Sequence, residues 1–386
     1  MDKTTSPQDF RKNFHNPNLP CLIDFQEDEN SPFRYVNKHW RTANTTTTTQ
    51  KVNRNWFLKM FGPNTLVPLR YYPQNESFDL DTAGRAKECE TKEVTLQEWV
   101  QLLEGTISTE GDDQQDHSYY LKDWHLQMMM LDQPLYSCPD IFQMDLLNPF
   151  LIQFTKGDYR FCYWGPPKSK TMRHSDVMHS FSWSYNVIGT KRWTFYREES
   201  ELDDDEKGWD QFSIIQRAGQ AIFVPCNWQH EVENIEETIS INHNWITVAN
   251  IDQTWECILG EMDEVDKELK SWGIAKDDNL ETYLESSESM LRGCVGLNVT
   301  AFFAMILVRL LELLELATTK VFVDDDDFDE LSFDCCRLVE MIQLLMEDEA
   351  IELNRRIEIV VQSKSLAQEL CELGLLASTL VCISDQ

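Results

Sequence analysis

The chain has 386 residues, of which 42% are hydrophobic and 11% aromatic, the composition of a folded protein with room for a second, smaller domain. Its 66 acidic side chains outnumber 34 basic ones, and the formal charge of −32 gives a surface that repels phosphate backbones. This balance argues against direct nucleic-acid binding. It favours a basic protein or peptide as partner, or serves only to keep the protein dissolved.

The first 117 residues predict a mixed α/β extension. The run 65–72, in which apolar and aromatic residues gather, predicts a short strand. Thr95 and Glu98 have the spacing of a capping box and predict a helix over 94–103, whose apolar residues share one face.

Residues 118–250 predict the structural core. Turn residues separate β-rich runs at 119–121, 159–164, 180–187, 192–196, 221–224 and 238–242. Many short strands at this spacing indicate a sandwich or barrel rather than alternating βα units. The acidic stretch 201–210 interrupts them and predicts an exposed loop.

Residues 251–386 predict a helical region. Apolar residues recur at helical spacing over 255–272, and further helices are expected over 302–316, 338–346 and 366–381, with an acidic turn at 324–327. The barrel, the helices themselves or a second subunit must cover their apolar faces. A homodimer formed through these helices is therefore an expectation.

The sequence predicts an intracellular protein without membrane contact. Eleven cysteines are scattered along the chain without a CxxC pair, and no basic-then-apolar leader opens it. Reduced thiols in the cytoplasm are expected, with presence in the nucleus left open. The most apolar window, 301–317, is too short and too charged to span a bilayer.

Two distant segments together predict a metal site. His174 and Asp176 lie two residues apart, a spacing that turns both side chains of a strand to one face. Far along the chain, a strand at 221–224 runs into a proline turn and delivers His230. Two imidazoles and one carboxylate form the facial triad of non-haem iron(II) oxygenases, whereas thiolates would favour zinc or iron–sulfur chemistry.

Such a triad leaves positions for a chelating 2-oxo acid and for dioxygen, so 2-oxoglutarate and O2 are the expected cosubstrates. The distal carboxylate of 2-oxoglutarate needs a buried cation, and Lys191 is the candidate. Its neighbour Arg192 should face the opposite side of the strand. Thr171 can add a hydroxyl. Asn242 and Asn244, two residues apart on a later strand, can direct both amides into one cavity.

Three segments together resemble a JmjC domain: 165–176 with His174-Ser-Asp176, 181–193 with the lysine, and 221–245 with His230. The likeness covers roughly residues 118–310. It implies a mainly β fold, a double-stranded β-helix of the jelly-roll or cupin-like kind, flanked by N-terminal helices and the C-terminal helical region. It also implies that His174, Asp176 and His230 bind Fe(II), and that Lys191 holds 2-oxoglutarate with the help of Thr171 and Tyr120. One departure from the family pattern, Cys226-Asn227 in place of a small Ser-Gly pair, concerns only the turn before His230.

The branch of the JmjC family that this chain resembles is associated with hydroxylating a lysine of the eukaryotic peptide-chain release factor. The resemblance thus implies an Fe(II)- and 2-oxoglutarate-dependent lysyl hydroxylase acting in translation termination. Demethylation of a histone or other protein lysine by the same iron chemistry is the alternative, although many demethylases have glutamate where this chain has Asp176. A catalytically silent scaffold is expected to lack a ligand or the lysine, and all four are present.

The position of several neighbouring side chains stays open at this point. His125 fits either the substrate groove or a structural hydrogen bond, and His243 fits packing on the outer side of the barrel better than a place in the cavity. Either Phe161 and Tyr163 or the alternating Cys162 and Trp164 must face the interior.

Overall fold

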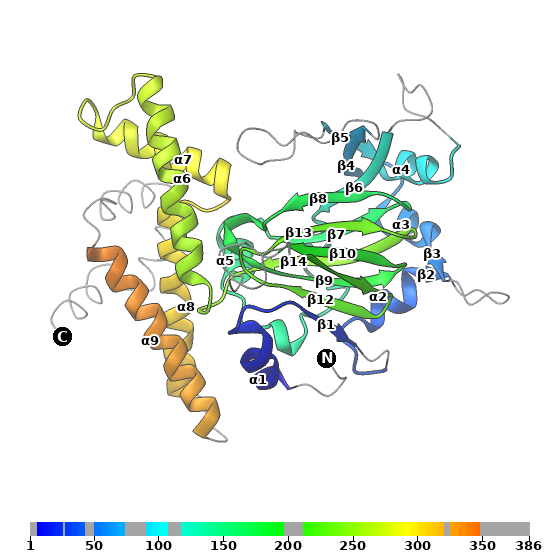
Figure 1. Cartoon of the computed structure of the whole chain (residues 1–386), viewed down its shortest axis with the longest axis horizontal. Coiled ribbons are helices and arrows are strands. Elements are labelled where there is room, and N and C mark those ends of the chain that lie inside the picture. The colour runs from blue at the N-terminus through cyan, green and yellow to red at the C-terminus, as the bar shows by residue number, and fades with distance from the viewer. Residues whose placement is uncertain are drawn as a thin grey trace, which may run out of the picture. The chain divides into compact units, whose positions relative to one another are not determined.

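The computed structural model describes residues 6–25, 28–42, 50–73, 90–106, 117–196, 211–319 and 325–347 (Figure 1). They fall into two compact units. One, the β unit, comprises Met1–Met144, Asp158–Asp176 and Ser180–Trp245. The other, the helical unit, comprises Asp145–Gly157, Val177–His179 and Ile246–Gln386.

The β unit is built on two antiparallel sheets. The large sheet has the strand order β1-β12-β9-β14-β7-β6-β4-β5, and the small sheet the order β11-β10-β13-β8. The large-sheet strands are β1 (Cys21–Asp24), β4 (Leu66–Pro73), β5 (Glu90–Thr95), β6 (His117–Trp124), β7 (Arg160–Gly165), β9 (Phe181–Ile188), β12 (Gln220–Val224) and β14 (Thr238–Trp245). The small-sheet strands are β8 (Lys170–His174), β10 (Lys191–Tyr196), β11 (Gln211–Gln216) and β13 (Gln229–Asn234). The predicted double-stranded β-helix is confirmed.

The N-terminal segment belongs to the same unit. Strands β1, β4 and β5 hydrogen-bond into the large sheet, so the compact units divide the chain differently from the three predicted segments 1–117, 118–250 and 251–386. A small ribbon of β2 (Arg41–Thr42) and β3 (Lys51–Val52) and several short helices complete the β unit. These helices are α1 (Pro7–Phe10), η1 (Arg11–His15), α2 (Arg34–His39), α3 (Arg54–Phe61), α4 (Leu96–Leu103), η2 (Leu126–Met130) and η3 (Asp140–Phe142). The expected capping box of Thr95 and Glu98 opens α4, which begins at Leu96.

The two faces of the large sheet differ in chemistry. One face is aromatic: Phe33 of the N-terminal segment stacks on Tyr185 at 3.6 Å between ring centroids, and Phe142 of η3 stacks on Trp183 at 5.1 Å. Strand alternation turns the polar residues of β9 and β14 to the other face, toward the small sheet. A hydrogen bond from Lys191 of the small sheet to Ser240 of β14 shows this orientation. The polar interior is where the candidate site lies.

The helical unit confirms most of the predicted helices. Its elements are α5 (Leu147–Phe154), the short η4 (Val177–His179), α6 (Ile251–Ser271), α7 (Leu280–Val295), α8 (Val299–Thr319) and α9 (Asp325–Glu347). Helix α6 packs on α7, and α8 on α9 (Figure 1).

One prediction in this region is wrong: the acidic turn at 324–327 is mostly the first turn of α9, where the helix dipole stabilises negative charge. The predicted helix 366–381 and the predicted acidic loop 201–210 lie outside the described residues.

Two further observations concern the described part of the chain. All eight of its cysteines are free thiols. No single helix there is both long and apolar enough to cross a membrane, although α7 and α8, bent by 74° relative to one another, would suffice together by length and composition.

Candidate active site

His174, Asp176 and His230 converge at one end of the β unit. Their nearest ligand atoms all lie within 4.8 Å of one another. The ring centroids of His174 and His230 are 4.4 Å apart, and His174 Nε2 lies 3.9 Å from Asp176 Oδ1. The sequence analysis placed these three residues together, and the structure brings them together.

Strand pairing explains the convergence. His230 on β13 lies directly opposite His174 on the antiparallel strand β8. Strand β8 ends at His174, so Asp176 lies in the following loop rather than on the strand. The hydroxyl of Ser182 on β9 donates to Asp176 Oδ2 at 2.6 Å and holds the carboxylate, which leaves Oδ1 on the side of His174.

Both imidazoles are oriented by backbone carbonyls. Nδ1 of His174 lies 2.7 Å from the carbonyl oxygen of Met172, and Nδ1 of His230 lies 3.0 Å from that of Trp228. A carbonyl accepts only, so each Nδ1 carries the proton and each Nε2 lone pair is available to a metal. Burial, followed by the neighbouring His230, lowers the pKa of His174 to about 4. The neutral ring that a metal requires is therefore the stable form at neutral pH.

The turn before His230 contains the Cys226-Asn227 pair that departs from the family pattern. Asn227 adopts a φ of 62°, in the left-handed region that favours glycine and that asparagine tolerates better than most residues. Next to it, the backbone N–H of Cys226 donates to the side chain of Asn18 at 2.9 Å, which ties this turn to the N-terminal segment.

Lys191 lies inside the β unit with its side chain buried, at 1% exposure. Its Nζ donates to Ser240 Oγ at 2.6 Å and lies 6.0 Å from the ring centroid of Tyr163. Burial lowers the pKa of Lys191 to about 7. Arg192 points to the exposed side, as predicted.

No ion pair among the described residues involves Lys191. A buried ammonium group without a carboxylate partner is costly and fits a pocket that receives an anionic cosubstrate.

The other predicted cosubstrate residues lie on strands β6, β8 and β14 of the β unit. Asn242 donates to Ser240 Oγ at 3.1 Å, next to Lys191. A β-bulge on β8, where the two residues Met172 and Arg173 oppose the single residue Glu231 of β13, turns Thr171 to the same face as His174. Tyr120 is fully buried, with its ring edge-on to Tyr163 at 5.9 Å. Asn244 donates to Ser180 Oγ at 3.0 Å, and its cross-strand partner is Ser182.

The structure settles two of the open choices. Phe161 and Tyr163 face the interior, since Tyr163 lies beside Lys191 and the alternating Trp164 packs on Phe57 on the opposite face. His243 lies on the outer face, with its Nε2 2.7 Å from the hydroxyl of Tyr136 and its ring 4.1 Å from that of Trp183. The prediction that His243 packs outside the cavity is confirmed.

Sequence reasoning missed several residues of the pocket. The hydroxyls of Ser182 and Ser240 are the closest partners of Asp176 and Lys191. Lys122 on β6 has its Nζ 5.1 Å from the centroid of Tyr163, so a second cation lies near the site. Alternation along β14 could have identified Ser240, because it lies two residues from Asn242, which was already expected to face the cavity.

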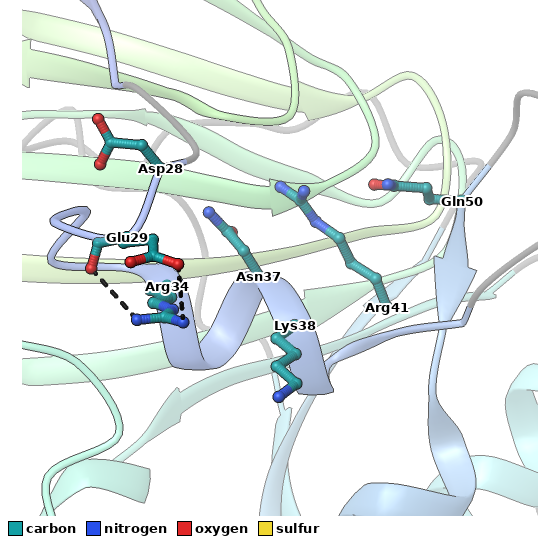
Figure 2. Close-up of a pocket in the computed structure, with 7 residues that line it drawn as sticks. All are labelled: Asp28, Glu29, Arg34, Asn37, Lys38, Arg41 and Gln50. Atoms are coloured by element: carbon teal, nitrogen blue, oxygen red, sulfur yellow. Dashed lines mark hydrogen bonds and ion pairs between the residues drawn. The ribbon is translucent and has the colours of Figure 1, made fainter.

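The donor set fits the group that the triad predicts. Two imidazole nitrogens and one carboxylate oxygen, held within 4.8 Å of one another, suit iron(II), and no thiol is part of the cluster. A separate cavity of about 410 Å³ lies beside α2, lined by Asp28, Glu29, Arg34, Asn37, Lys38, Arg41 and Gln50. Figure 2 shows Arg34 paired with Glu29 there, and none of the predicted site residues lines this cavity.

Comparison with known proteins agrees with this geometry. No family model matches the chain. The chain is 33% identical over 320 residues to the 2-oxoglutarate and iron-dependent oxygenase JMJD4 of Danio rerio, over 76% of this chain and 70% of that protein. The protein of the same name from Homo sapiens is 28% identical over 397 residues, which covers 94% and 88% of the two chains. An arginine-specific demethylase of Arabidopsis thaliana, JMJ20, is 30% identical over 256 residues, or 56% and 54%.

Proposed function

The chain belongs to the family of the 2-oxoglutarate and iron-dependent oxygenases JMJD4, and from this premise we propose that it hydroxylates a lysine side chain of the eukaryotic release factor. Iron and 2-oxoglutarate, with dioxygen, are the cofactor and cosubstrates of the family. The observation that supports the proposal most is the convergence of His174, Asp176 and His230 in the unit that also buries Lys191, which has no carboxylate partner among the described residues.

Each residue has a proposed role. His174 Nε2, His230 Nε2 and one oxygen of Asp176 would hold the iron, with Ser182 keeping the carboxylate in place. Lys191 would pair with the distal carboxylate of 2-oxoglutarate, assisted by the hydroxyl groups of Thr171 and Tyr120. Asn242 and Asn244 would contact the cosubstrate from β14.

When bound, iron(II) with 2-oxoglutarate and dioxygen supplies the oxidation that inserts one oxygen atom into a C–H bond and releases succinate and carbon dioxide. The protein contributes position and charge. Lys191 fixes the orientation of the anionic cosubstrate, and the carbonyls of Met172 and Trp228 keep both imidazoles in the ligating tautomer. The aromatic ring of Tyr163 lines the pocket beside the lysine and limits the access of water.

The overall charge supports a basic protein as substrate. With 66 acidic and 34 basic side chains, the enzyme would attract a lysine-rich surface and repel nucleic acid. The ionic-strength dependence of turnover tests this attraction between the acidic enzyme and a basic substrate.

We also propose that the protein works in the cytoplasm, where the translation machinery lies, and that a second copy pairs with it through the C-terminal helices.

Mass spectrometry of a release-factor peptide after incubation with enzyme, Fe(II), 2-oxoglutarate and dioxygen tests the function. A gain of one oxygen atom on a lysine is expected, together with succinate. The variant His174→Ala should abolish both, while Arg192→Ala, one residue from Lys191 but on the outer face, should retain them. If the peptide stays unmodified while succinate forms steadily, the release factor is not the substrate, but the oxygenase activity still stands.

Demethylation of a basic side chain is a second candidate, supported by the similarity to the arginine-specific demethylase of Arabidopsis thaliana. The same assay separates the two, because a methylated peptide would lose a methyl group and release formaldehyde. Loss of methyl groups from methyl-lysine or methyl-arginine peptides, without oxygen gain on unmethylated lysine, would favour this candidate.

A further inference from the structure

His125 and Asp158 form a hydrogen-bonded pair at the edge of the candidate site. Nδ1 of His125 lies 2.6 Å from Asp158 Oδ1, and Arg160 donates from Nε to Oδ2 of the same carboxylate, also at 2.6 Å. The side chain of Asp158 is 0% exposed, whereas that of His125 is 48% exposed. A buried carboxylate therefore holds a solvent-facing imidazole.

The pair lies at the end of the β unit where the metal ligands lie. His125 follows directly after β6, and Asp158 precedes β7. At this end of β7 the carbonyl of Tyr159 accepts from the N–H of Asn244, whose cross-strand partner Ser182 bonds to Asp176. The His125 ring also contacts Phe161 edge-on at 4.9 Å, and Phe161 faces the interior beside Tyr163. His125 thus lies at the same end of the β unit as the metal ligands and contacts a residue that faces the interior.

The hydrogen bonds fix the chemistry that the imidazole presents. Asp158 accepts from Arg160 Nε through Oδ2, and its other oxygen, Oδ1, accepts from His125, so Nδ1 of His125 is the donor of that bond. In the neutral ring the lone pair is then on Nε2. No hydrogen bond to this Nε2 occurs among the described residues. Nε2 of the neutral ring is therefore an exposed hydrogen-bond acceptor in a fixed orientation, which suits an N–H donor of a bound ligand.

We infer that His125 is a substrate-binding residue that accepts a hydrogen bond from an N–H group of the basic peptide at the mouth of the pocket. This rests on the proposed function for the identity of the peptide. Asp158 acts as the positioning residue that fixes the tautomer and the orientation of the ring, and Arg160 holds Asp158 in place through a second hydrogen bond.

The variant His125→Asn separates this role from a structural one, because its amide can replace the bond from Nδ1 to Asp158 but lacks the outward nitrogen. Binding of a fluorescein-labelled release-factor lysine peptide would be followed by anisotropy, with the protein loaded with Mn(II) and N-oxalylglycine. Binding should weaken about tenfold, as for one lost hydrogen bond to a charged donor. Succinate formation without peptide and the melting temperature should stay at the wild-type level. His39→Asn, on α2, is the matched control.

Equal peptide affinity of His125→Asn and the wild type would overturn the inference. A parallel fall in peptide binding, peptide-free succinate formation and melting temperature would also overturn it, since that pattern indicates a structural histidine.

If the wild type neither binds nor oxidises the release-factor peptide, the proposed function fails by itself. The variants are then compared on the lysine- or arginine-containing peptide that the wild type selects from a panel. Equal affinity of the wild type and His125→Asn for that peptide would again reject the role of His125.

Discussion

Lys191 and Ser240, 49 residues apart, join the two sheets of the β unit through a 2.6 Å hydrogen bond from Nζ to Oγ. The ammonium group is buried among a hydroxyl group and an aromatic ring, with another lysine, Lys122, near the same ring. Without cosubstrate this arrangement costs stability, because the buried charge has no opposite charge beside it in the described part of the chain. The pocket is therefore arranged for an anion rather than for the stability of the empty protein.

Replacing Lys191 by methionine, which has a similar length and no charge, should have opposite effects on stability and binding. The metal-free protein should gain roughly 1–3 kcal/mol of unfolding free energy, because a buried unpaired charge is removed. The affinity for 2-oxoglutarate should fall by about two orders of magnitude, since its distal carboxylate would then be buried unpaired. Chemical denaturation and calorimetric titration of Mn(II)-loaded protein measure the two effects. A Lys191→Met variant that is less stable than the wild type and binds 2-oxoglutarate normally would contradict both the expected gain in stability and the expected loss of affinity.

The pH dependence of 2-oxoglutarate binding follows from the same residue. Burial lowers the pKa of Lys191 to about 7 in the free protein, and a bound carboxylate should raise this pKa again. Between pH 7 and the unfolded pKa of 10.5 the unfolded chain binds more protons than the folded one. The stability contribution of Lys191 should therefore rise with pH in this window.

Binding has the opposite sign, because the cosubstrate prefers the protonated lysine. The affinity should be constant below pH 7 and fall by roughly tenfold per pH unit above it. At pH 8, calorimetry in buffers of different ionisation enthalpy should show uptake of nearly one proton per 2-oxoglutarate in the wild type and none in Lys191→Met. Equal proton uptake by both proteins would assign the titration to another group.

Ser182 offers a test of how Asp176 is held. Removing its hydroxyl in Ser182→Ala takes away the 2.6 Å hydrogen bond to Asp176 Oδ2 and should weaken metal binding by about tenfold or more. Ser184, two residues along the same face of β9, has a buried hydroxyl without a hydrogen-bond partner among the described residues, so Ser184→Ala is the matched control. Mn(II) affinity, read by paramagnetic resonance, should drop only in the first variant. Equal affinities would show that Asp176 needs no such support.

The sequence identifies strands best where one face of the strand is clearly apolar and the other clearly polar. Strands β9 and β14 were predicted because apolar residues alternate with serine and asparagine, and the structure places the polar set on the site side. Strands β8, β11 and β13 of the small sheet were not predicted. Their residues are largely polar and half exposed, and their register depends on pairing with one another.

The site was predictable to the extent that it depends on residue type. Two histidines, one aspartate and one lysine at these spacings already indicate an iron and 2-oxo acid pocket. Spacing along the chain contains no sign that Ser182 supports Asp176, or that Asp158, 33 residues from His125, holds its ring. Such partners are set by which strands lie side by side. The same limit applies to the β-bulge that brings Thr171 to the face of His174.

The turn that delivers Lys191 depends on Gly189, between β9 and β10. Its φ is 82°, and an added Cβ would lie 2.3 Å from the carbonyl oxygen of Glu237. Gly189→Ala should therefore cost roughly 2–3 kcal/mol of unfolding free energy through backbone strain and the displaced neighbour. Because the turn would shift Lys191, 2-oxoglutarate affinity should fall as well.

Gly260 provides a control of opposite sign: it lies inside α6, and an added Cβ would meet no heavy atom within 4 Å. Gly260→Ala should stabilise the protein by roughly 0.5–1 kcal/mol, because alanine has less backbone freedom to lose. Urea denaturation measures both variants. If Gly189→Ala unfolds at the wild-type urea concentration and binds 2-oxoglutarate normally, the turn accepts a side chain and the position of Lys191 does not depend on glycine.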